Sequence, residues 1–170
     1  MANKSVVRLD KVKSVYNGNI FSVRSAVALE NGFVGKLGDI EAANRDVHAL
    51  VAPVALDKLV LIANPALVYD NARLGSGLEN QYAMEANEVV RAYELAANDV
   101  VGIAKEGVNG TAVVGQYLVA GAGFKLVPSA TKPASGFAAK VVRLETVGGT
   151  YALNATQVPT VYVVIEVLQN

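Results

Sequence analysis

The chain has 170 residues, of which 52% are hydrophobic and 18% charged, and it contains no cysteine, no tryptophan and a single histidine. This composition predicts one folded domain without disulfides, and it leaves few side chains for a metal cage or an activated nucleophile. Fifteen basic residues balance fifteen acidic residues without forming a block of either sign, which argues against a nucleic-acid partner.

Membrane insertion and export are also not expected. The purely apolar runs are short, such as Leu59–Ala63, whereas a membrane-spanning helix needs about 20 apolar residues. The N-terminal residues Met1–Asp10 lack the apolar core of a secretory signal. We therefore expect a protein that is made in the cytoplasm and does not enter a membrane.

The N-terminal part is predicted to form an antiparallel meander of three strands, Ser5–Tyr16, Asn19–Leu29 and Phe33–Leu37. Glycine-containing dipeptides that favour tight turns separate these stretches, and similar dipeptides occur further on. The four turn signals are Asn17-Gly18, Asn31-Gly32, Asn109-Gly110 and Gly148-Gly149. In the second strand, the period of two places Phe21, Val23, Val27 and Leu29 on one face.

Two further strands are predicted at Arg45–Ala52 and Asp57–Ala63, and a long excursion loop follows at residues 64–87. This loop exceeds the usual loop length of about 12 to 15 residues and contains residue types favoured at interfaces. A short helix is expected within it near Leu78–Met84. The excursion is accordingly the first place to look for partner contacts.

The second half of the chain is rich in β-branched residues. Strands are predicted at Val100–Ala104 and Ala112–Val119, whereas residues 89–97 fit a strand and a helix equally well. Residues 128–136 are expected to form a connecting loop.

The C-terminal part is predicted to pair Phe137–Val147 with a short strand at Thr150–Leu153, and a last strand at Pro159–Leu168 closes the chain. In that last strand the alternate residues Val161, Val163, Ile165 and Val167 form an apolar face, which indicates a central, covered strand. We expect a mainly β fold for residues 1–170, an antiparallel sandwich or small barrel with one long excursion loop and at most a short helix.

Catalytic and cofactor sites are not indicated. His48 shares a strand face with Asp46, but no second histidine or cysteine completes a metal site, and no Gly-x-Ser-x-Gly motif accompanies it. Gly121 and Gly123 lack the third glycine of a nucleotide-binding loop and favour a bend instead. Asp39, Glu41 and Asp46 lack the calcium-loop spacing. We therefore expect no cofactor and no enzymatic activity.

One resemblance extends over most of the chain, from about Leu9 to Val127. It is carried by five segments in fixed order, namely residues 27–38 (VALENGFVGKLG), 51–53 (VAP), 61–65 (LIANP), 91–95 (RAYEL) and 98–101 (NDVV). In this order the chain resembles the head decoration, or cement, proteins of tailed bacteriophages. The resemblance implies a structural virion protein, made in the host cytoplasm, that binds the outer surface of the expanded capsid in many copies.

On this hypothesis the partners are the major capsid protein and neighbouring copies of the chain, with a trimer favoured among the assemblies that capsid symmetry permits. The N-terminal segment 1–13, as an arm, and the excursion 64–87 are the expected contact segments. The candidate contact residues are Val6, Arg8, Tyr69, Arg73, Leu74, Tyr82 and Met84. A neck or tail component and a small-ligand or sugar-binding module, the latter using Tyr69 and Tyr82, remain alternatives, and an enzyme would require His48 beside a carboxylate in a cleft.

Overall fold

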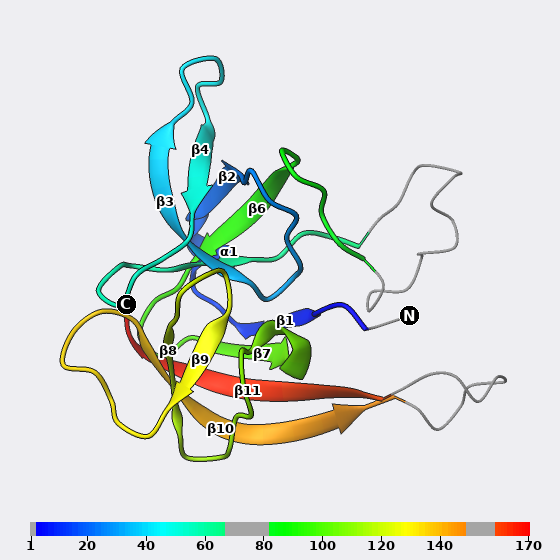
Figure 1. Cartoon of the computed structure of the whole chain (residues 1–170), viewed down its shortest axis with the longest axis vertical. Helices are drawn as coiled ribbons and strands as arrows, with labels where there is room; N and C mark the ends of the chain where they lie inside the picture. The colour runs from blue at the N-terminus through cyan, green and yellow to red at the C-terminus, as the bar shows by residue number, and fades with distance from the viewer. Residues whose placement is uncertain (1–2, 67–81, 149–158) are drawn as a thin grey trace, which may run out of the picture.

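The computed structural model describes residues 3–66, 82–148 and 159–170. Its strands form a six-stranded sheet and a closed five-stranded barrel, which pack together (Figure 1). The predicted fold class is confirmed, because the described chain is mainly β and its one α-helix, α1 (Ser14–Asn17), has four residues.

The six-stranded sheet is antiparallel throughout. Its spatial order is β1 (Val7–Lys11), β7 (Val100–Ala104), β11 (Thr160–Gln169), β10 (Ala138–Val147), β8 (Tyr117–Ala120) and β9 (Leu126–Ser129). The barrel order is β2 (Ile20–Arg24), β4 (Val47–Val51), β3 (Val34–Ile40), β5 (Val60–Ile62) and β6 (Val89–Glu94). Strands β2 and β4 pair in parallel. One 3₁₀ turn, η3 (Lys105–Gly107), follows β7.

Two hydrophobic clusters meet at strands β5 and β6. In and beside β5, Val60 and Ile62 belong to the cluster inside the barrel, whereas Leu59 and Leu61 belong to the larger cluster between barrel and sheet. The same alternation divides the β6 region, where Val90 and Ala92 are inside and Tyr93 and Leu95 outside. On one face of β6 Val90 and Ala92 are buried, and on the other Tyr93 is buried while Val89 and Arg91 are exposed. Of the two conformations that the sequence fits equally well, residues 89–94 adopt the strand.

The predicted N-terminal meander is wrong. Strand β1 pairs with β7, β2 pairs with β4 and β6, and β3 pairs with β4 and β5, so no two of the three pair with each other. The Asn17-Gly18 signal ends helix α1, where Gly18 adopts a φ of 79°, instead of closing a hairpin. The chain thereby passes from the sheet into the barrel.

The C-terminal prediction is confirmed for the last strand. Strand β11 lies between β7 and β10, and Val163, Ile165 and Val167 are buried in the main cluster. Its partner β10 starts at Ala138, one residue after the predicted start. The expected strand Thr150–Leu153 lies outside the described residues.

Two predictions in the second half need correction. The predicted strand Ala112–Val119 begins only at Tyr117, and the expected loop 128–136 overlaps strand β9, which ends at Ser129. Strand β9 is an edge strand of the sheet, which pairs with β8 and has one isolated bridge from Leu126 to Val108. Pro128 is tolerated in β9 because an edge strand can lack an amide hydrogen.

The central part of the excursion falls outside the described residues, together with Tyr69, Arg73 and Leu74 and most of the helix expected near Leu78–Met84. Tyr82–Met84 are not helical, since Met84 forms an isolated antiparallel bridge with Leu29. Within the described ranges, no helix is long and apolar enough to cross a membrane.

Candidate docking surface

The segment Leu29–Gly32, hereafter the 29–32 turn, leads into a tight turn before β3. It contacts three segments that are distant in sequence, namely the N-terminal segment and the two described ends of the excursion. The turn is closed by a hydrogen bond from Phe33 N to Glu30 O of 3.2 Å. Gly32 adopts a φ of +87°, and a Cβ atom there would approach Ile103 Cγ2 to 2.9 Å. The backbone conformation and the close packing on β7 together require glycine at this position.

The N-terminal segment is attached to this turn through Glu30. The backbone amide of Ser5 donates to Glu30 Oε2 at 2.8 Å, and Lys4 Nζ lies 3.1 Å from Glu30 Oε1. Ala104 N donates to Val6 O at 2.8 Å, which extends the contact between the segment and β7. The chain before β1 is therefore held against the body of the protein from residue 4 onward.

The start of the excursion is attached through Asn31. Its Nδ2 donates to Asn64 O at 2.9 Å, and its Oδ1 accepts from Asn64 N at 2.8 Å. Asn31 is buried. One side chain thus satisfies both backbone groups of Asn64, where the chain leaves β5.

The end of the excursion is attached through Leu29. Leu29 N donates to Met84 O at 3.1 Å, and Met84 N donates to Leu29 O at 2.9 Å. Asn64 Nδ2 also donates to Tyr82 Oη at 2.8 Å, so the two ends are bonded to each other. The two described ends of the excursion therefore lie at neighbouring points of the barrel.

A pocket of about 220 Å³ lies where the N-terminal strand meets the start of the excursion. Val6, Val7 and Leu9 line one side of it, and residues 63–66 line another, with Asn31 and Tyr93 completing the wall. We call this pocket together with the 29–32 turn the docking surface. It brings together the two segments in which the sequence predicts partner contacts.

Three of the candidate contact residues are buried within the chain. Val6 packs with Ala104 and Tyr162, and Tyr82 and Met84 belong to the barrel cluster, where Met84 is 1% exposed. Tyr82 and Met84 therefore anchor the excursion, and the buried Tyr82 ring offers no open face for stacking on a sugar. Within the expected contact arm at residues 1–13, Val7–Lys11 form β1 of the sheet and Val12 is buried.

Arg8 is the remaining described candidate, and it is partly exposed. Its guanidinium carbon lies 4.3 Å from the centre of the Tyr162 ring, and its Nη2 is hydrogen-bonded to Glu145 of β10. Arg143 contacts the same carboxylate. The hydrogen bond from Arg8 lowers the pKa of Glu145 and raises the pKa of Arg8, so this network is ionised near neutral pH.

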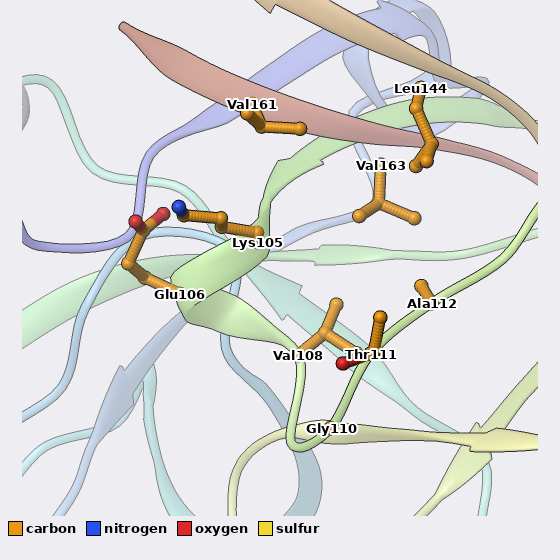
Figure 2. Close-up of a pocket in the computed structure, with 9 residues that line it drawn as sticks. All are labelled: Lys105, Glu106, Val108, Gly110, Thr111, Ala112, Leu144, Val161 and Val163. Atoms are coloured by element: carbon orange, nitrogen blue, oxygen red, sulfur yellow. The ribbon is translucent and has the colours of Figure 1, made fainter. Parts of the chain in front are cut away.

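A second, larger groove was not predicted from the sequence. It measures about 390 Å³ and lies between the β10–β11 hairpin and the chain around η3 (Figure 2). Leu144, Val161 and Val163 line the hairpin side, and Val108 and Ala112 lie opposite. In the sequence, the apolar Leu144 lies between the charged Arg143 and Glu145. This alternation predicts a strand with one apolar face, but it does not show whether another part of the chain covers that face.

His48, which an enzymatic function would require, contacts a backbone carbonyl and an aromatic ring of its own chain. Its Nδ1 lies 3.1 Å from Gly38 O, and its ring meets that of Phe21 edge-on at 5.7 Å. Asp46 is exposed. Across residues 3–66, 82–148 and 159–170, no group of three or more histidine, cysteine or acidic side chains is placed to hold a metal ion.

The glycines at 121 and 123 form the predicted bend between β8 and β9. Gly123 adopts a φ of +104°, and a Cβ atom on Gly121 would lie 2.3 Å from Val127 Cγ2. Close packing inside the bend explains why glycine is needed at position 121.

No family model, no curated protein and no solved structure matches the chain.

Proposed function

We propose that the protein is a structural component of a bacteriophage virion, which decorates the outer surface of the capsid and stabilises it. Its principal partner is the major capsid protein, and neighbouring copies of the chain are a second partner. It acts through contacts and not through catalysis, without a cofactor, nucleic acid or membrane.

One observation supports this proposal most strongly. The 29–32 turn holds the N-terminal segment and both described ends of the excursion at one place. The residues that carry the resemblance to decoration proteins include this turn, at Val27–Gly38, and the start of the excursion, at Leu61–Pro65. The N-terminal segment and the excursion, which are the segments expected to contact the capsid, are therefore both attached to the 29–32 turn.

A reconstitution experiment tests this role. Capsids that lack the protein are incubated with the purified chain, and the number of bound copies is measured. Pro65→Glu places a charge on an exposed position that lines the docking surface, and we expect it to lower the number of bound copies. Ala43→Glu adds the same charge in the exposed β3–β4 loop and serves as the matched control.

Thermal unfolding of both variants is measured alongside, so that a folding defect is recognised. Equal binding of Pro65→Glu, Ala43→Glu and the unchanged chain would exclude the docking surface as the capsid contact. Absence of binding by the unchanged chain would contradict the decoration role itself.

A further inference from the structure

Strand β10 extends beyond its neighbour β8 and leaves part of one edge open. Strand β8 pairs only with Ala138–Lys140, and Val141 is bonded to the chain at Gly115 and Gln116. From Arg143 to Val147, β10 pairs with β11 alone within the described parts of the chain. Among the described residues, no strand pairs with the other side of this segment, so its backbone groups can pair with a strand of another chain.

The open edge is also apolar. Val142, Leu144 and Val147 are each about 45% exposed. Leu144 pairs with Val163 on the groove side of the hairpin, where both residues line the groove of about 390 Å³ (Figure 2). Arg143 and Glu145 face the opposite side, because side chains alternate along a strand.

We propose that this edge binds a second copy of the same chain, by antiparallel pairing of the two β10 strands around a two-fold axis at Leu144. In this register Arg143 of each copy lies opposite Glu145 of the other. Because Arg143 and Glu145 of one copy match Glu145 and Arg143 of the other, the charges of this edge are complementary to those of a second copy. This inference does not depend on the proposed function, and it predicts a two-fold pair where the sequence favours a trimer.

Charge selects this register over its neighbours. A two-fold axis at Arg143 would place two arginines directly opposite each other, and an axis at Glu145 would place two glutamates opposite each other. Like charges in directly opposed positions destabilise a strand pair, whereas opposite charges stabilise it. Glu145 is already held by Arg8 and Arg143 of its own copy, so its carboxylate is fixed before the second copy arrives.

Burial of apolar surface favours the same register. The two Leu144 side chains lie side by side on the groove face, and each covers part of the groove lined by Val161 and Val163. One pairing therefore satisfies the open backbone edge and covers the exposed apolar side chains. Such an interface is isologous and closes at two copies.

Cysteine crosslinking tests the register, because the chain has no cysteine of its own. Directly opposed residues of an antiparallel pair have Cβ atoms about 4.5–5.5 Å apart, close enough for a disulfide to form with small adjustments. We expect Leu144→Cys to form a disulfide-linked dimer under mild oxidation. Val113→Cys, which is similarly exposed but lies outside β10, should crosslink about tenfold more slowly.

Charge variants in the Leu144→Cys background complete the test. Arg143→Glu places two glutamates opposite each other twice per dimer, and we expect crosslinking to slow about tenfold. Arg143→Lys should retain the original rate. Lys140→Glu makes the same charge change at an exposed position outside the open edge and should have little effect.

Equal crosslinking rates for Leu144→Cys and Val113→Cys would overturn the proposal, as would a rate for Arg143→Glu equal to that of Lys140→Glu. Urea unfolding of each variant verifies that the compared chains are folded.

Discussion

At the scale of single residues, the buried amide of Asn31 binds both backbone groups of Asn64. We expect Asn31→Ala to lower the free energy of unfolding by about 1–3 kcal/mol, since two buried polar groups lose their partner. Urea denaturation measures this change. Asn109→Ala, at an exposed position, is the control and should change stability by less than about 0.5 kcal/mol. Equal losses in the two variants would refute the role of Asn31.

A second residue-scale prediction concerns pH. Asp57 accepts from Lys36 Nζ at 2.7 Å and from Val54 N at 2.9 Å, and these contacts lower its pKa from the ordinary value of 3.8. A lowered pKa in the folded state stabilises the protein above the unfolded-state pKa, and this contribution is lost as the pH falls through the folded-state pKa.

Asp57→Asn should therefore be less stable than the unchanged chain at pH 7, and the difference should shrink as the pH falls below 3.8. Urea unfolding at a series of pH values measures it, with the exposed Asp46→Asn as the matched variant. A stability difference that stays constant down to pH values well below 3.8 would contradict the assignment.

Residue roles were only partly predictable from the sequence. The sequence favours Tyr82 and Met84 as partner contacts because aromatic residues and methionine are enriched at interfaces, but these residue types are equally suited to anchor a loop in a core. The distinction depends on whether the barrel cluster lies beneath them, and sequence spacing contains no such information. Arg8 is partly exposed, and its hydrogen bond with Glu145 joins positions that are 137 residues apart in the sequence.

At the scale of secondary-structure elements, the barrel has room for only a hydrogen atom at position 35 of β3. A Cβ atom on Gly35 would lie 2.6 Å from Cδ1 and 2.7 Å from Cγ of the buried Leu50. We expect Gly35→Ala to destabilise the protein by about 1–3 kcal/mol through overpacking. The same substitution in a Leu50→Ala background should cost less, and a double-mutant cycle in urea measures the difference. An equal cost in both backgrounds would show that Leu50 is not the cause.

The N-terminal strand yields another prediction at this scale. Val12, at the end of β1, is buried in the main cluster, and the next residue is attached through Lys13 N to Asp99 Oδ1 at 3.1 Å. Val12→Ala should therefore cost about 2 kcal/mol, whereas the exposed Val15→Ala should cost much less. Thermal unfolding compares the two. A neutral Val12→Ala would mean that the segment is a free arm after all.

Strand positions were largely predictable, but strand partners were not. Apolar periodicity located the regions of β4, β5, β7, β10 and β11, because that signal is local. Pairing of β1 with β7 joins residues that are about 95 positions apart, for example Val7 and Ile103, and no local pattern specifies such a partner. The predicted loop 128–136 includes Pro128 and Ser129, which are the last two residues of β9, and an edge strand tolerates proline.

At the scale of the whole molecule, the main hydrophobic cluster joins the barrel to the sheet, and a second cluster fills the barrel. Strands β1 and β10 belong to the same sheet, with β7 and β11 between them (Figure 1), and Arg8 of β1 is hydrogen-bonded to Glu145 of β10. The docking surface includes residues of β1, whereas the proposed pairing edge lies on β10, so two strands of the sheet separate the two surfaces.

The most direct test of the decoration role is the copy number in the virion. Quantitative mass spectrometry of purified particles, with DNA-filled heads separated from tails, gives the ratio of this protein to the major capsid protein. We predict that the protein stays with the heads at a ratio of about one to one, or a simple fraction of it set by capsid symmetry. A few copies that travel with the tails would indicate a neck or tail component instead, and absence from the particles would contradict a structural role in the virion.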